Sequence, residues 1–148
     1  MTGTPGGGAF RVWEIGRVLP GDARLTRLAF IHSGRIDGVI ATVSINGQEW
    51  ESPRFGVGEV GRKLETTTID IGPDDHLISI DVFMGRSSNG GPIITKLIVR
   101  MSKQVVEVGE KTGEFKGTAL CPPGRRVVGV CGRAGWFLDS IGLQTVNK

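Results

Sequence analysis

The stretch from residue 132 to residue 142 reads GRAGWFLDSIG, and the rest of the chain is best interpreted outward from it. A glycine-containing turn is followed there by the run Leu138-Asp139-Ser140-Ile141, in which apolar residues flank an aspartate and a small residue. The run Ile36-Asp37-Gly38-Val39 repeats this pattern, and Pro92-Ile93-Ile94-Thr95 follows a similar glycine-rich turn without the aspartate. Three such units in one short chain predict sheets arranged around a pseudo-threefold axis.

Between these units the dominant signal is an apolar residue at every second position, which is typical of a half-buried strand. Residues 39–45, 78–82 and 95–101 alternate in this way, with Thr42, Ser79 and Asp81 expected on the outer faces. Further strands are indicated at residues 25–31, 64–71, 104–108 and 127–131. Asn46-Gly47 predicts a tight hairpin turn, and no window indicates an amphipathic helix. The pattern predicts an all-β domain that is closed or layered.

Composition narrows the class of protein. The 148 residues predict one domain spanning residues 1–148, and 39% hydrophobic with 22% charged residues is ordinary for a globular protein. The net charge of +3 is dispersed, so binding to nucleic acid is not expected. No apolar run approaches the roughly 20 residues that span a bilayer, so membrane insertion is not expected. The absence of a secretory signal at the start favours a cytoplasmic location.

The two cysteines, Cys121 and Cys131, flank the turn-forming run Pro122-Pro123-Gly124. If the chain folds back there as a hairpin, Cys121 pairs near Val127 or Val128, too far from Cys131 for a disulfide. Two free thiols fit a reducing compartment. Neither the cysteines nor the two histidines have metal-ligand spacing, so neither a metal site nor a cofactor is predicted.

Residues 132–142 resemble the C-terminal signature of the jacalin-related lectins. Four further stretches, spread over the whole chain, resemble motifs of the same family: Gly117–Pro122, Gly129–Arg133, Gly6–Phe10 and Ser33–Val39. The resemblance implies a β-prism I fold, with three four-stranded antiparallel sheets around a pseudo-threefold axis. It also implies binding of a monosaccharide at one end of the prism without a metal.

By the same resemblance, the sugar site consists of the Gly135–Asp139 loop and Gly7 of the N-terminal glycine-rich loop. The chemistry is reasonable for these residues, because an ionised Asp139 accepts protons from two adjacent hydroxyls in charge-assisted hydrogen bonds. Backbone N–H groups of Trp136 and Phe137 can donate to the same hydroxyls, and the Trp136 ring can cover an apolar face of the sugar.

The resemblance also implies a role in sugar binding for two other loops. Arg86, Ser87 and Ser88 correspond to a loop that tunes specificity. Gly34, Arg35 and Asp37 correspond to a weaker second site, although this turn is one residue shorter than Gly-x-x-x-Asp. Galactose-binding members of the family are cut within the N-terminal loop, whereas Gly6-Gly7-Gly8 is continuous here. The resemblance therefore favours mannose or glucose.

Alternative interpretations stay open for these residues. Asp139 can cap its own turn, and Trp136 can be a core or interface aromatic. Gly6-Gly7-Gly8 can be a frayed terminus, and residues 86–88 can be a solvated hairpin tip.

Other functions also compete with the lectin hypothesis. A glycosidase would need a second carboxylate facing Asp139, and the sequence shows none, so no enzyme is predicted. A β-prism scaffold that acts through protein partners is the alternative function. A single sugar contact is weak, so a homo-oligomer, a dimer or larger, is expected to supply avidity.

Overall fold

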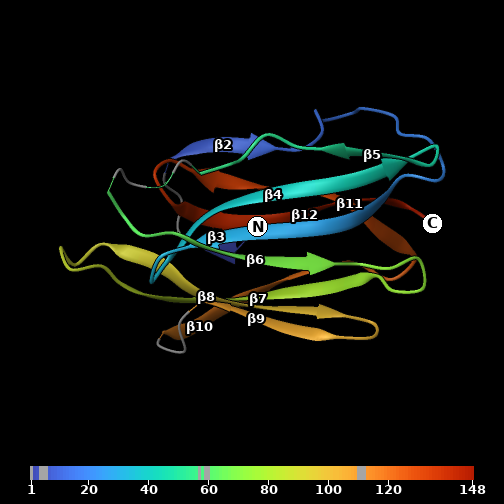
Figure 1. Ribbon diagram of the computed structural model, residues 1–148. Coiled ribbons are helices and arrows are strands. Elements are labelled where there is room, and N and C mark those ends of the chain that lie inside the picture. Colours follow the sequence, from blue (N-terminus) through green and yellow to red (C-terminus); the bar gives the residue numbers. More distant parts are fainter. Residues whose placement is uncertain (1, 4–6, 57, 59–60, 110–112) are drawn as a thin grey trace.

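The computed structural model describes residues 2–3, 7–56, 58, 61–109 and 113–148. All its regular elements are β-strands (Figure 1). Their bounds are β1 Thr2–Gly3, β2 Gly8–Arg11, β3 Arg24–His32, β4 Ile36–Ile45, β5 Gln48–Glu51, β6 Glu65–Asp70, β7 Leu77–Arg86, β8 Pro92–Met101, β9 Val105–Gly109, β10 Glu114–Leu120, β11 Arg125–Ala134 and β12 Leu138–Asn147. No helix long and apolar enough to cross a membrane is found in the described part of the chain.

The strands form three four-stranded sheets, in which every neighbouring pair runs antiparallel. The strand orders are β5-β4-β3-β6, β10-β7-β8-β9 and β1-β12-β11-β2. The third sheet joins the two ends of the chain, because the N-terminal strands β1 and β2 flank the C-terminal hairpin β11–β12. This closure brings Gly7 and Gly8 to the C-terminal signature, whereas Gly6 of the predicted N-terminal loop lies outside the described residues.

Each sheet is built on one long central hairpin, and the three hairpins share their irregularities. The first register shift of each hairpin leaves an extra residue on its first strand, and these residues are Thr26 in β3, Ile78 in β7 and Val128 in β11. The second shift leaves an extra residue on the partner strand, and these residues are Asp37 in β4, Thr95 in β8 and Asp139 in β12. A β-bulge bends its strand and increases the local twist. The bulges recur at equivalent positions of the three hairpins, which confirms the predicted threefold repetition.

The core lies between the three sheets and receives side chains from all of them. Residues that are fully buried include Leu28, Phe30, Val39, Ile80, Leu97, Val130, Leu138 and Ile141. The predicted alternation holds in β8, where Thr95, Leu97, Val99 and Met101 are buried. It fails at the start of β7, where the bulge turns Ile78 outward and Ser79 inward. Thr42 was also expected on an outer face and is buried, and its carbonyl accepts a hydrogen bond from the hydroxyl of Thr26.

One predicted turn is confirmed and one predicted hairpin is wrong. Asn46 has a positive φ of 52°, and the Asn46-Gly47 turn joins β4 to β5 with Ile45 opposite Gln48. The run after Cys121 does not form a hairpin with the next strand, because β10 pairs with β7 whereas β11 pairs with β12 and β2. Cys121 follows β10 of one sheet, whereas Cys131 lies in β11 of another, and both are free, partly buried thiols.

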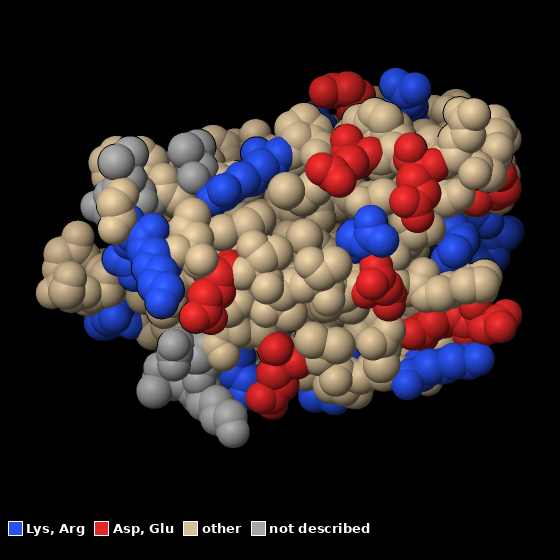
Figure 2. Space-filling view, viewed as in Figure 1, with Lys and Arg blue, Asp and Glu red and all other residues tan. Residues whose placement is uncertain are grey.

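The turns of the three central hairpins lie at the same end of the prism, on the left in Figure 1. They comprise residues 33–35, 87–91 and 135–137. On the face shown in Figure 2, positive and negative side chains are interspersed. Oppositely charged side chains also pair across strands, as Arg27 of β3 and Asp70 of β6 do at 2.7 Å.

Candidate functional site at one end of the prism

The turn between β11 and β12 is held in one conformation by its own backbone and by the core. The Gly135 N–H donates to the Phe137 carbonyl over 3.0 Å and closes the turn. Leu138 is fully buried, whereas Asp139 is the extra residue of β12 at the register shift beside Ala134 and keeps a partly exposed side chain. The residues of the predicted Gly135–Asp139 loop therefore present one carboxylate at the end of the prism.

Gly7 lies directly against this carboxylate, as the resemblance implied. Its φ is +58°, and a Cβ added to Gly7 would lie 2.7 Å from Oδ2 of Asp139 and 2.7 Å from the carbonyl carbon of Ala134. The Gly7 carbonyl accepts a hydrogen bond of 2.9 Å from Nη2 of Arg133. Only glycine fits in this position, and Gly7 is docked on the β11–β12 hairpin instead of forming a frayed terminus.

The Asp139 carboxylate is partly buried, yet no described residue donates a hydrogen bond to it. Burial raises the pKa of the Asp139 carboxyl, and the positive charge of Arg133 opposes part of that shift. Across the described residues, the backbone N–H groups of Trp136 and Phe137 also donate to no protein group. The two backbone N–H groups can donate hydrogen bonds and the Asp139 carboxylate can accept them. Together they are complementary to a ligand with adjacent hydroxyls, since each hydroxyl both donates and accepts.

The two aromatic residues of the turn have opposite environments. The Trp136 side chain is 63% exposed, so it is not a core residue, and it can meet a ligand or a partner surface. Phe137 is partly buried and lies under the guanidinium of Arg35, whose central carbon is 4.4 Å from the ring centroid. Trp136 is therefore available at the surface, whereas the Phe137 ring attaches the turn to the neighbouring sheet.

The predicted specificity loop is a closed hairpin tip at the same end of the prism. Arg86 Nη1 donates to the Gly90 carbonyl over 2.8 Å, and Ser87 N–H donates to the Gly91 carbonyl over 2.8 Å. The Ser87 hydroxyl donates to the side chain of Asn89. Arg86 lines a cavity of about 260 Å³ with Met84, Gly85, Pro92, Glu114 and Lys116. A role of Arg86, Ser87 and Ser88 in specificity stays a prediction.

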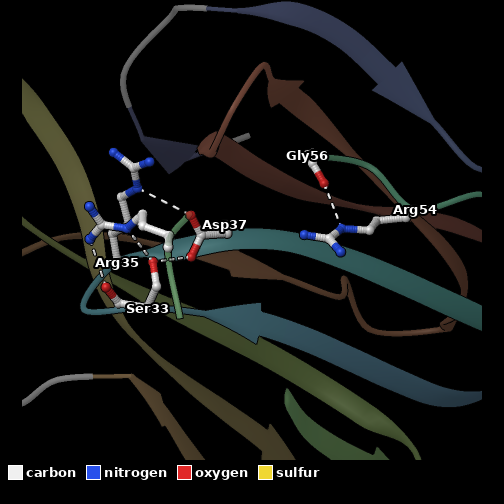
Figure 3. Close-up of polar contacts among 6 residues, drawn as sticks. Ser33, Arg35, Asp37, Arg54 and Gly56 are labelled. Carbon is white, nitrogen blue, oxygen red and sulfur yellow. Dashed lines mark hydrogen bonds and ion pairs between the residues drawn. The ribbon is translucent and has the colours of Figure 1, made fainter. Parts of the chain in front are cut away.

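The turn that contains Gly34, Arg35 and Asp37 differs from the Gly135–Asp139 loop in its carboxylate. Asp37 is completely buried, and its two oxygens accept hydrogen bonds from the Ser33 hydroxyl and from Nε of Arg35 at 3.1 Å (Figure 3). A sugar could reach this carboxylate only if those bonds were broken. A second sugar site stays a prediction, and the geometry gives it no support.

Some contacts of the site were not predicted. Arg133 holds Gly7, and the Gly58 N–H donates to the Trp136 carbonyl over 2.8 Å. Arg133 belongs to the quoted motif, but nothing in the sequence indicates that it reaches the N-terminal loop. Within the described residues, no three His, Cys, Asp or Glu side chains gather where they could hold a metal ion.

Comparison with known proteins identifies the family of the chain. A family model described as "Jacalin-like lectin domain" matches residues 1–144. Jacalin-related lectin 19 of Arabidopsis thaliana is 30% identical over 147 residues, which cover 97% of this chain and 78% of that protein. Jacalin-related lectin 3 of the same plant is 28% identical over 143 residues, which cover 95% of this chain and 22% of that longer protein.

The fold also matches solved structures. A mannose-specific jacalin-related lectin from Morus nigra, in complex with mannose, matches with a TM-score of 0.77 and 22% identity. The match covers 97% of this chain and 89% of that chain.

Proposed function

Because the chain belongs to the jacalin-like lectin domain family, we propose that it binds mannose or glucose units of glycans through Gly7 and the Gly135–Asp139 loop. The family is one of non-catalytic carbohydrate-binding proteins, and the three sheets form its β-prism. The choice of sugar and the assignment of residues to the site are the proposed part.

The observation that supports this site best is the unsatisfied polar chemistry around Asp139. A partly buried carboxylate without a described donor lies beside the N–H groups of Trp136 and Phe137, which have no described acceptor. A hexose with two adjacent hydroxyls can satisfy all of these groups, because each hydroxyl both donates and accepts. In this arrangement the two hydroxyls donate to Asp139 and accept from the backbone.

The preference for mannose or glucose has two supports. By the family resemblance, galactose-binding members are cut within the N-terminal loop, whereas Gly6-Gly7-Gly8 is continuous in this sequence. The structurally similar lectin from Morus nigra is described as mannose-specific. At 22% identity that likeness concerns the fold, so the sugar has to be tested directly.

The test is an NMR titration of the ¹⁵N-labelled protein with methyl α-mannoside, methyl α-glucoside and methyl α-galactoside. We expect millimolar affinity for the first two, about −4 kcal/mol, with the largest shifts at residues 135–139. Asp139→Ala is expected to lose binding, because each hydrogen bond to a charged group contributes about 1.5–3 kcal/mol. The control is Asp70→Ala, which removes an exposed aspartate from β6.

The outcomes separate the parts of the proposal. Tighter binding of the galactoside would refute the proposed specificity. Binding that survives in Asp139→Ala would refute the proposed site. No shift with any of the three sugars would refute monosaccharide binding.

We also propose that the protein acts as a homo-oligomer, because a millimolar site needs several copies on one particle to hold a glycan surface. Light scattering on the purified protein tests this, and a monomer at all concentrations would contradict it.

A further inference from the structure

We propose that Arg35 is a positioning residue for the sugar-binding turn, and that the buried Asp37 holds Arg35 in place. This inference rests on the proposed function, because it assigns a task to residues outside the sugar contacts. It gives the Gly34–Asp37 turn a supporting role in place of a second sugar site.

The contact between Arg35 and Phe137 joins two different sheets. Arg35 precedes β4, whereas Phe137 lies between β11 and β12. The guanidinium carbon lies 4.4 Å from the centre of the Phe137 ring, and Arg35 is only 7% exposed. A cation over an aromatic face is attracted more strongly when water is excluded from the contact. The Phe137 ring is therefore held from one side by a desolvated charge.

Asp37 fixes the orientation of that charge (Figure 3). Its carboxylate accepts from Nε of Arg35 at 3.1 Å and from the Ser33 hydroxyl. Arg62 in turn donates from Nε to the Ser33 hydroxyl and from Nη2 to the Ser33 carbonyl, both over 2.7 Å. Because Asp37 is completely buried and Arg35 nearly so, this charge-assisted bond leaves the guanidinium plane of Arg35 little freedom.

A buried ion pair is costly to desolvate and often adds little to stability. We therefore assign the Arg35–Asp37 pair a role in orienting a side chain. The pair occupies the position in the first unit that corresponds to the sugar loop in the third unit. In the first unit, the Asp37 carboxylate is completely buried and orients Arg35. In the third unit, Asp139 faces the side of its turn where we propose that the sugar binds.

A second attachment starts from the same region of β4. Val39 and Phe55 exchange two backbone hydrogen bonds of 2.9 and 3.0 Å, which lay the segment after β5 across β4. A Cβ on Gly56 would lie 2.1 Å from the Asp37 carbonyl oxygen, so the two backbones are in direct contact. Gly58 then donates to the Trp136 carbonyl over 2.8 Å.

These two attachments fix the turn on both sides of the peptide group between Trp136 and Phe137. The Trp136 carbonyl is held by Gly58, and the Phe137 ring is held by Arg35. The N–H of Phe137 belongs to the same rigid peptide group, so its direction is set before a sugar arrives. Preorganisation of this kind improves affinity by avoiding the entropic cost of ordering the loop on binding.

The test compares variants that weaken the contact between Arg35 and the Phe137 ring with a control variant that leaves this contact intact. Arg35→Met/Asp37→Asn removes both charges together, which avoids leaving a lone buried charge. Phe137→Leu removes the ring and keeps the Arg35–Asp37 pair. Arg35→Lys keeps a cation above the ring. The matched control is Arg27→Met, which breaks an exposed arginine–aspartate pair in the same sheet.

Two measurements are made on each variant: the Kd for methyl α-mannoside by NMR titration, and hydrogen exchange at the Gly58 and Gly135 amides. In the double variant and in Phe137→Leu we expect the Kd to rise about twofold to thirtyfold, the range of a cation–π contact. The two amides are expected to exchange faster, since they border the loosened turn. Arg35→Lys is expected to recover part of the loss, and Arg27→Met to match the wild type.

The outcomes distinguish this proposal from the proposed function. A folded double variant and a folded Phe137→Leu with wild-type Kd and wild-type amide exchange would overturn the positioning role. If the wild-type protein binds none of the sugars, the proposed function fails. Amide exchange then decides the positioning role alone, and unchanged exchange at Gly58 and Gly135 in the variants would overturn it.

Discussion

Replacing Gly7 with alanine is expected to weaken sugar binding at least about tenfold while the β-prism stays folded. The added methyl group would lie 2.7 Å from Oδ2 of Asp139 and 2.7 Å from the carbonyl carbon of Ala134. Contacts this short are not tolerated, so Gly7 has to move or the carboxylate has to turn away. Gly7 also has a φ of +58°, a conformation that costs a residue with a Cβ about 1–2 kcal/mol.

The loss of affinity in Gly7→Ala follows from the steric clash and the backbone strain. Relief of the backbone strain requires the N-terminal loop to leave the hairpin, which removes one wall of the site. A loss of about 1.4 kcal/mol is a tenfold change in Kd, so we expect methyl α-mannoside to bind at least about tenfold more weakly. Because Gly7 lies at the end of the prism, the loss of stability is limited to the strain, and Tm is expected to fall by less than about 8 °C.

The neighbouring glycine provides the control. A Cβ on Gly8 would approach nothing closer than the Ala134 carbonyl oxygen at 3.9 Å, so Gly8→Ala is expected to bind as the wild type does. Both variants are measured by NMR titration and by thermal melting. Wild-type affinity in Gly7→Ala would refute the assignment of this loop to the site. Equal loss in both variants would show that the steric argument is wrong.

Two further predictions concern pH and the N-terminal segment. We expect the sugar to bind the ionised form of Asp139, whose pKa is raised by burial. Affinity is therefore lost as pH falls through that raised pKa. This loss occurs at a higher pH than it would for an aspartate with an ordinary pKa. A titration with methyl α-mannoside over pH, with the fold followed by circular dichroism, tests this, and affinity that is constant down to about pH 3.9 would contradict it. Gln144 accepts from the N–H groups of Val12 and Trp13 at 3.1 and 3.0 Å and donates to the Trp13 carbonyl at 2.8 Å. Gln144→Ala is therefore expected to lower the free energy of unfolding in urea by about 1–3 kcal/mol, since the N–H and carbonyl of Trp13 lose their partner while the Val12 N–H keeps only the Val130 carbonyl. The exposed Gln48→Ala is the neutral control, and equal values for the two variants would refute the role.

The fold class was predictable because its signals are local. Alternation of apolar residues and the Asn46-Gly47 turn depend on neighbours in the sequence. The turn appears in the structure as expected, and the alternation does so in β8 but not at the buried Thr42 of β4. The alternation misplaced Ile78 and Ser79, because a bulge at that point shifts the register and the sequence carries no mark of it. The hairpin expected after Cys121 was wrong for a related reason. A turn signal indicates that the chain bends, but the neighbouring strands decide which sheet each side joins.

For the site, the sequence by itself determined which residues carry the chemistry, and the tertiary structure decided which of them meet. Gly135, Trp136, Phe137 and Asp139 are close in the sequence, so their turn could be identified from the motif alone. The contact of Gly7 with Asp139 exists only because β2 and β11 pair in the sheet that joins both ends of the chain.

The same distinction explains the two related aspartates. Asp37 and Asp139 occupy equivalent runs in the sequence, yet one is completely buried between Ser33 and Arg35 and the other lies partly exposed beside Gly7. Their difference arises from what packs against each turn, since Arg35 extends from one unit onto Phe137 of another. Contacts between units depend on how the three sheets close around the core, which no local pattern encodes.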